Sequence, residues 1–226
     1  MQRTPSNVQI PGRGVVARLG LLVCLAGCAA RGAPVPEAPA AADPQEQFWD
    51  ALRALCGQAF TGKIVANVGG GEGPDPFEGK ALRMHVRSCS ADEIRVPFHV
   101  GEDRSRTWVF TRRAGGLRLE HDHRHADGSA DELTMYGGDT SGPGTATEQR
   151  FPTNLFSREL FVQRGLEQSV PNVWVIELVP GRLYGYALTR PGREVRVHFD
   201  LTSPIDPPPP PCGHVGPSGS PHREGD

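Results

Sequence analysis

The sequence has very little lysine, no strong net charge and no long apolar run. Only Lys63 and Lys80 are lysines among the 24 basic residues of the 226-residue chain. The formal net charge is -2 at pH 7, so the sequence predicts no nucleic-acid partner. No apolar stretch reaches the ~18 residues of a spanning helix, and no heptad repeat is sustained. These absences exclude a transmembrane helix and a coiled coil. The arginine excess fits the composition of an Ala/Gly/Pro/Arg-rich genome and carries no functional argument.

The first residues have the composition of a secretion signal. Arg3, Arg13 and Arg18 are the only charged residues before Arg31, and the short apolar stretch 19–26 follows them. This stretch is too short to span a bilayer but suits the apolar region of a signal peptide. We therefore expect residues 1–27 to be a signal segment.

The tetrapeptide Leu25-Ala26-Gly27-Cys28 resembles the lipobox of bacterial lipoproteins. The resemblance implies a diacylglyceryl group on Cys28, cleavage before it and N-acylation with a fatty acid such as palmitate. Ala29 follows the cysteine in place of Asp, which by the same resemblance favours the outer membrane. The protein would then face the periplasm, held to the membrane by its acyl chains. Ordinary secretion with cleavage after an alanine remains the alternative.

The remaining cysteines suggest one disulfide. Cys24 would be removed with the signal segment. In addition to the lipidated Cys28, the mature chain would keep Cys56, Cys89 and Cys212. An oxidising periplasm permits disulfides, and Cys56 and Cys89 lie at the ends of a predicted helix and a predicted strand. We therefore pair them and leave Cys212 in the tail, with two buried free thiols as the alternative. The spacing fits no zinc ribbon.

Composition divides the mature chain into three parts. Residues 28–42 are an Ala/Pro-rich linker, 43–203 form the folded domain, and 204–226 are a Pro-rich tail expected to stay disordered. Asp43-Pro44-Gln45-Glu46 is a helix start, with Asp43 as the cap, and an amphipathic helix is predicted over 44–56.

After Gly57 the hydrophobic period changes from 3.6 to 2. Clean alternation of apolar and polar residues predicts antiparallel strands with one dry face and one wet face. About ten short strands joined by hairpins predict an all-β, up-and-down meander that closes as a barrel or packs as a sandwich. A second short helix is expected over 155–168. The strands are expected around residues 59–68, 82–87, 94–100, 106–112, 117–125, 132–137, 146–151, 172–179, 183–190 and 195–201.

The strongest candidate site is the run His121-Asp122-His123-Arg124-His125. On a strand the three histidines share the face of Leu119, while Asp122 and Arg124 take the other face. Two histidines at i and i+2 can reach one zinc ion, so His121, His123 and His125 are candidate metal ligands. The alternative is that they line the interior and hydrogen-bond to neighbours.

Further ligand-binding candidates come from the following loops. If Asp127-Gly128 is a two-residue turn, Glu132 faces His123 and Asp131 faces Arg124. Asp139 and Ser141 follow the paired glycines after Tyr136 and are expected at the rim, in a segment that otherwise reads as a loop. Four large aromatic residues are expected to fill the core or line a pocket, with the core favoured: Trp108, Trp174, Tyr184 and Tyr186.

Two resemblances concern the whole domain. A helix followed by Phe60-Thr61-Gly62 and a meander resembles the calycin (lipocalin-like) architecture, but the Gly-x-Trp signature is missing. The stretches 48–57, 121–128 and 136–140 resemble a family of bacterial envelope proteins with no established activity.

The sequence leaves three functions open. The first is a non-enzymatic outer-membrane lipoprotein whose β domain binds a small or lipidic ligand, or an envelope protein. The second is a metal-binding protein or metal-dependent enzyme that uses zinc on His121, His123 and His125. The third is a structural envelope protein. No catalytic residue is assigned, because no second motif completes a site.

Overall fold

The structure is a computed structural model that describes residues 42–70 and 77–213. The predicted signal segment, Cys28 and nearly all of the predicted linker lie outside the described residues, as does the tail from residue 214.

The first described element is the predicted amphipathic helix, α1 (Pro44–Arg53). Asp43 caps it, since its carboxylate accepts a hydrogen bond of 2.8 Å from the backbone N–H of Gln45. The helix ends three residues earlier than predicted, in a turn that finishes at Gly57 with a φ of +84°. Phe48, Trp49 and Leu52 on one face are fully buried in the core.

The rest of the described chain is mainly β-structure, as predicted. Two short helical segments interrupt it where one helix over 155–168 was expected: α2 (Leu155–Gln163) and the 3-10 turn η1 (Glu167–Ser169), separated by Gly165 with a φ of +69°. The strands are β1 (Ala59–Val68), β2 (Leu82–His85), β3 (Ser88–Cys89), β4 (Glu93–Val100), β5 (Asp103–Arg113), β6 (Gly116–His123), β7 (Tyr136–Asp139), β8 (Glu148–Pro152), β9 (Val173–Val179), β10 (Leu183–Arg190) and β11 (Arg193–Asp200).

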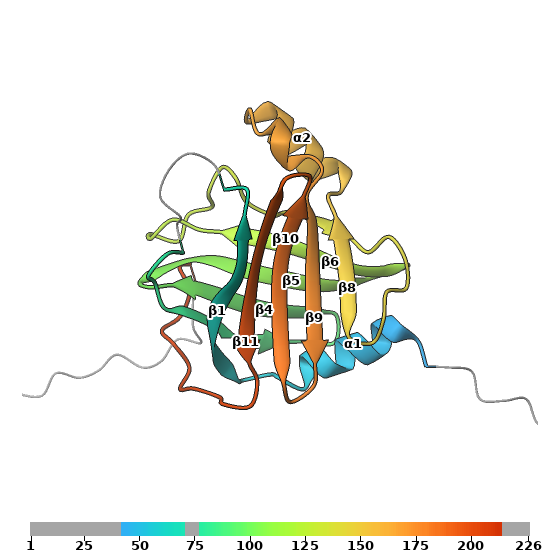
Figure 1. Ribbon diagram of the computed structural model, residues 1–226, viewed down its shortest axis with the longest axis vertical. Coiled ribbons are helices and arrows are strands. Elements are labelled where there is room, and N and C mark those ends of the chain that lie inside the picture. Colours follow the sequence, from blue (N-terminus) through green and yellow to red (C-terminus); the bar gives the residue numbers. More distant parts are fainter. Residues whose placement is uncertain (1–41, 71–76, 214–226) are drawn as a thin grey trace, which may run out of the picture. The chain divides into compact units, whose positions relative to one another are not determined.

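These strands form one antiparallel sheet that curls into a nearly closed barrel. The order is β7-β6-β5-β4-β2-β1-β11-β10-β9-β8, with β3 paired to β4 beside this path. Most neighbours are consecutive in sequence, and the pairing of β1 with β11 joins the two halves of the meander. Figure 1 shows β1 and β8–β11 in front of β4–β6, with α2 at one end of the strands and α1 at the other.

The barrel closes at a seam between β7 and the end of β8. Gly138 forms a backbone bridge with Thr153, and the backbone N–H of Asn154 donates to the carbonyl of Gly137 at 3.1 Å. The buried hydroxyl of Ser157 accepts from the N–H of Gly137 at 2.7 Å. A Cβ on Gly138 would lie 1.9 Å from the carbonyl oxygen of Pro152, so only glycine fits there. The paired glycines that read as a loop in the sequence thus belong to a strand and allow the barrel to close.

We therefore expect Gly138→Ala to lower the free energy of unfolding by roughly 1–3 kcal/mol, since the added methyl group meets rigid backbone. Gly142→Ala is the matched control, because a Cβ at Gly142 would meet nothing within 4 Å. Urea titration of both variants measures the difference. Equal stability of the two would contradict this account of the seam.

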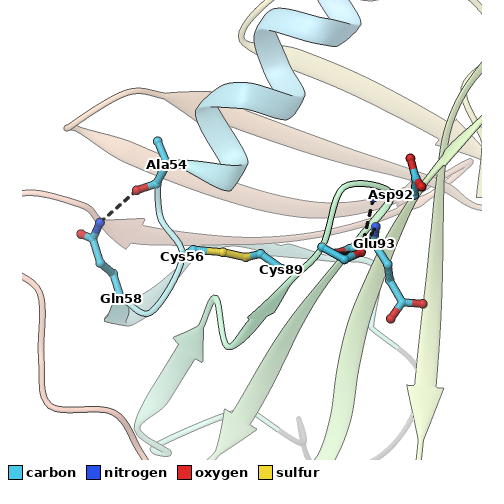
Figure 2. The surroundings of a disulfide bond; sticks show 7 residues. Ala54, Cys56, Gln58, Cys89, Asp92 and Glu93 are labelled. Carbon is cyan, nitrogen blue, oxygen red and sulfur yellow. Dashed lines mark hydrogen bonds between the residues drawn. A yellow bond between two sulfur atoms is a disulfide. The ribbon is translucent and has the colours of Figure 1, made fainter.

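The turn after α1 is tied to the barrel in two ways. A disulfide joins Cys56 of this turn to Cys89 of β3, the pairing predicted from the sequence, with a Cα–Cα distance of 6.4 Å (Figure 2). The N–H of Gly57 also donates to the carbonyl of Val86 at 2.7 Å. Helix α1 is thereby held against the barrel, where its apolar face joins the core.

The first part of the Pro-rich tail, residues 204–213, contacts the barrel although the tail was expected to be disordered. The N–H of Ile205 donates to the carbonyl of Ala59 at 2.8 Å, and the N–H of Cys212 donates to the carbonyl of Arg104 at 3.1 Å. Pro208 is buried. Prolines remove backbone donors but do not prevent the segment from accepting hydrogen bonds and packing along a surface.

Candidate functional site

The barrel contains a cavity of about 240 Å³ near the end that carries α2. Phe161 of α2 and Ser169 of η1 are among its lining residues, whereas no residue of α1 is. Aromatic rings supply much of its wall: Phe98, Trp108, Tyr136, Phe161, Trp174 and Tyr186. The rings of Trp108 and Tyr186 stack with centroids 4.5 Å apart and an interplanar angle of 13°. The cavity is therefore lined mainly by flat, rigid and apolar rings.

Strand β6 places its histidines as the alternation predicted. His121 and His123 line the cavity on the side of Leu119, which lies in the core. Asp122 points the other way and forms ion pairs with Arg124 at 2.7 Å and with Arg95 at 3.2 Å. The face assignment made from the sequence is thus confirmed.

His121 has both ring nitrogens hydrogen-bonded. Its Nδ1 lies 3.1 Å from the carbonyl oxygen of Tyr136, and its Nε2 lies 2.9 Å from the hydroxyl of Tyr186. Because a carbonyl only accepts, Nδ1 must carry the proton and Nε2 accepts from Tyr186. His123 in turn contacts the hydroxyl of Tyr136 through Nε2 at 3.2 Å. The two histidines thus line the interior and hydrogen-bond to neighbouring residues, the alternative to metal binding that the sequence left open, and their partners are tyrosines.

The titratable side chains on the cavity wall other than arginine are neutral near pH 7. Burial, followed by the nearby His123, lowers the pKa of His121 to about 3. Burial, followed by the charge of Arg106, lowers the pKa of His123. Burial raises the pKa of Tyr136 to about 12 and raises that of Tyr186 well above its usual value. A histidine with a pKa near 3 is a weak base, far from the value that suits proton transfer near neutral pH.

The third histidine and Glu132 do not join this site. Strand β6 ends at His123, and His125 follows it as an exposed residue, as expected for the histidine nearest the turn. Arg124 bridges Ala130, where the two-residue turn predicted Asp131, so the register is displaced by one residue. The turn contains one more residue than predicted, with the N–H of His125 donating to the carbonyl of Ser129 at 2.9 Å. Glu132 itself lies in a bend outside the strands, is exposed and does not line the cavity.

The other predicted ligand-binding residues, Glu132, Asp139 and Ser141, lie away from the cavity that His121 and His123 line. Glu132 forms an ion pair with Arg164 after α2. Asp139 lies opposite Arg118 and accepts two hydrogen bonds from it, at 2.6 and 3.0 Å, while Ser141 is exposed beyond β7.

Within residues 42–70 and 77–213, no group of three or more His, Cys, Asp or Glu side chains is placed to hold a metal ion. His125 lies apart from the other two histidines. His121 has no ring nitrogen available unless it gives up one of its hydrogen bonds. The predicted zinc set is thus not assembled by the described residues.

Sequence reasoning missed the arginines of the cavity and undervalued its aromatic residues. Arg106, Arg190 and Arg193 all line the cavity. Of the four aromatic residues weighed from the sequence, only Tyr184 is confined to the core, where it is fully buried. The alternation in β10 could have predicted part of this wall, because every second residue lies on one face of a strand. The residues on that face are Tyr184, Tyr186, Leu188 and Arg190.

No known protein family, curated protein or solved structure matches this chain. The resemblances to lipoproteins, to envelope proteins and to calycins accordingly stay predictions. In the part of the chain that the structure describes, no helix has the length and apolar character needed to cross a membrane.

Proposed function

We propose that this protein is a non-enzymatic outer-membrane lipoprotein whose periplasmic β domain binds a small, largely apolar ligand inside its barrel. The observation that carries the proposal is the aromatic cavity beside His121, which is open to a ligand near α2. Concave apolar pockets with a few convergent polar groups are the usual form of small-molecule sites.

The volume bears on the size of the ligand. Pockets for drug-sized ligands hold roughly 300–1,000 Å³, whereas this cavity holds about 240 Å³. A compact ligand of one or two rings suits it better than a long acyl chain. Between the open choices of a small and a lipidic ligand, the cavity therefore favours the small one.

The non-enzymatic part of the proposal rests on the polar groups. Among the described residues no carboxylate lines the cavity, and its histidines are neutral and engaged with tyrosines. Such groups orient a ligand by hydrogen bonding, but they make a poor acid–base pair.

Filling the cavity tests the proposal. We expect the wild-type protein to bind one equivalent of naphthylmethanol saturably in calorimetric titration. Leu188→Trp places a larger side chain in the cavity wall and should weaken this binding about tenfold or more, since a well-packed site does not accept extra volume without cost.

The control is Val65→Trp, which adds the same side chain at a position of β1 that is 42% exposed. It should bind naphthylmethanol as the wild type does. Saturable binding that is unchanged by Leu188→Trp would mean that the probe binds elsewhere, and absence of any saturable binding would overturn the proposed ligand site.

The lipid anchor has its own test. Replacing Cys28 by serine removes the thiol that would carry the diacylglyceryl group, so we expect the protein to move from the membrane pellet to the soluble fraction. Fractionation of cells that express each form, followed by immunoblotting, measures this. Continued pelleting of a Cys28→Ser protein that has lost its signal segment would count against lipid anchoring.

Metal binding is the second candidate, and His121 and His123 are the residues that favour it, since they lie on one face of β6. It requires His121 to exchange its bond to Tyr186 or Tyr136 for a metal. A rise in melting temperature on adding zinc that is absent from His121→Gln would support this alternative over the binding barrel.

A further inference from the structure

Two arginines that are cross-strand partners line the cavity, and neither has an acidic partner within residues 42–70 and 77–213. Arg190 ends β10 and Arg193 begins β11, and the two are direct cross-strand partners on either side of the Pro191-Gly192 turn. Both line the cavity. Like charges directly opposite each other in a hairpin are unfavourable, so this pair costs the fold some stability.

The other contacts of these arginines are with neutral groups. Arg190 donates to the hydroxyl of Ser169 at 3.3 Å and to the side-chain oxygen of Asn172 at 3.1 Å. Arg193 donates to the side-chain oxygen of Asn67 at 2.5 Å and to the carbonyl of Val68 at 2.9 Å. Burial, with the charge of Arg193 as the second cause, lowers the pKa of Arg190, yet a guanidinium stays protonated in proteins.

Many arginines of the described residues, including the third one on the cavity wall, have a carboxylate partner. Among the described residues, eight arginines form an ion pair with a carboxylate, and neither Arg190 nor Arg193 is one of them: Arg95, Arg106, Arg112, Arg118, Arg124, Arg150, Arg164 and Arg196. Arg106 also lines the cavity, but Asp103 neutralises it. Among the described residues, the cavity wall consequently carries two arginines that no carboxylate compensates.

Resting on the proposed function, we propose that Arg190 and Arg193 form an anion subsite, so that the ligand is a compact aromatic carboxylate or phosphate. Its anionic group lies between the two guanidinium groups, which recognise planar oxyanions through paired hydrogen bonds. Its ring lies among Trp108, Trp174 and Tyr186. The anion removes the repulsion across the hairpin, which gives binding an electrostatic contribution that a neutral ligand does not have.

The test compares naphthyl ligands of equal ring size and different charge, by calorimetric titration of the purified protein with its disulfide intact. We expect naphthoate or naphthyl phosphate to bind about tenfold or more tightly than naphthylmethanol, and naphthylmethylamine to bind more weakly than the alcohol. The tighter of the two anions identifies whether the natural group is a carboxylate or a phosphate. Raising the salt concentration should weaken binding of the anions and not of the alcohol.

The double variant Arg190→Gln/Arg193→Gln keeps hydrogen-bond donors but loses the charges. It should bind the anions no more tightly than the alcohol. Arg196→Gln is the matched control. Arg196 lies on β11 like Arg193, but it forms an ion pair with Glu194 at 3.0 Å and does not line the cavity. A melting curve with a normal transition confirms that each variant is folded.

The outcomes separate the two proposals. Equal affinity for the alcohol and both anions, or an anion preference that survives in the double variant, overturns the anion subsite and leaves the binding barrel standing. Failure of all four ligands to bind overturns both proposals. An anion preference abolished by the double variant and kept by Arg196→Gln supports the subsite.

Discussion

Replacing Cys56 and Cys89 together by alanine is expected to lower the free energy of unfolding by roughly 3–4 kcal/mol. The disulfide closes a loop with a sequence separation of 33 residues, and loops of this length lose several kcal/mol of chain entropy in the unfolded state when cross-linked. It also fixes the end of α1, whose Trp49 and Leu52 are fully buried against the barrel. A domain with a stability of about 5–15 kcal/mol would lose a large share of it.

The measurement is urea-induced unfolding of the double variant beside the wild type under oxidising conditions. Cys212→Ala is the control, because Cys212 is a free, partly exposed cysteine whose described contact is made by its backbone. It should stay within about 0.5 kcal/mol of wild type. Non-reducing mass mapping should recover Cys56 and Cys89 in one linked peptide pair, and a double variant as stable as the wild type would remove the argument that this bond holds α1 in place.

The elements that local physical chemistry determines could be read from the sequence. The cap at Asp43, the apolar face that contains Phe48 and Leu52, and the alternation in β6 and β11 each depend on residues only a few positions apart. The burial of His121 and the opposite direction of Asp122 followed from period-2 alternation alone, since a strand offers only two faces.

Features that depend on the length of a turn could not be read in the same way. One extra residue in the loop around Asp127 displaced the strand partner of Arg124 from Asp131 to Ala130, and Glu132 lies in a bend instead of the predicted strand. A slip of one residue reverses every side chain that follows, and the sequence offered no signal for the loop length.

Barrel closure and the cavity needed three-dimensional information. Gly138 was expected in the loop after the predicted strand 132–137, because the need for glycine beside the carbonyl oxygen of Pro152 comes from another strand and is not visible locally. The cavity arginines were likewise inconspicuous in an arginine-rich chain. What sets Arg190 and Arg193 apart is that they line the cavity without an ion-pair partner among the described residues, and that is a property of the folded sheet.

Acid is expected to unfold the domain because of its buried histidines. Burial, followed by the charges of Arg104 and Arg83, lowers the pKa of His99 to about 4, and burial lowers that of His121 to about 3, both from the ordinary value of 6.5. His99 is only 1% exposed and its Nε2 has no hydrogen-bond partner among the described residues, whereas His121 is 4% exposed. Both side chains are neutral in the folded protein.

The sign of the effect follows from the two pKa values of each group. Above about pH 6.5 both the folded and the unfolded histidines are neutral, and stability is at its maximum. As the pH falls below that value, the histidines of the unfolded chain become protonated while those of the folded protein stay neutral. The free energy of unfolding therefore decreases until the pH reaches the folded pKa values. At about pH 4 each of the two histidines should lower the free energy of unfolding by roughly 3 kcal/mol relative to pH 7. The two losses together approach the whole stability of a typical domain.

Urea titrations at a series of pH values between about 7 and 4 measure this loss. His99→Phe removes one of the two buried titrations and its unpaired nitrogen, because an apolar ring of similar size needs no partner there. We expect it to match or exceed wild-type stability at pH 7 and to retain roughly 3 kcal/mol more than wild type at about pH 4. His125→Gln, at an exposed position beyond β6, should follow the wild-type curve. If the His99→Phe curve fell as steeply as the wild-type curve, the acid loss would have to come from other groups, and the burial of a neutral His99 would not be its cause.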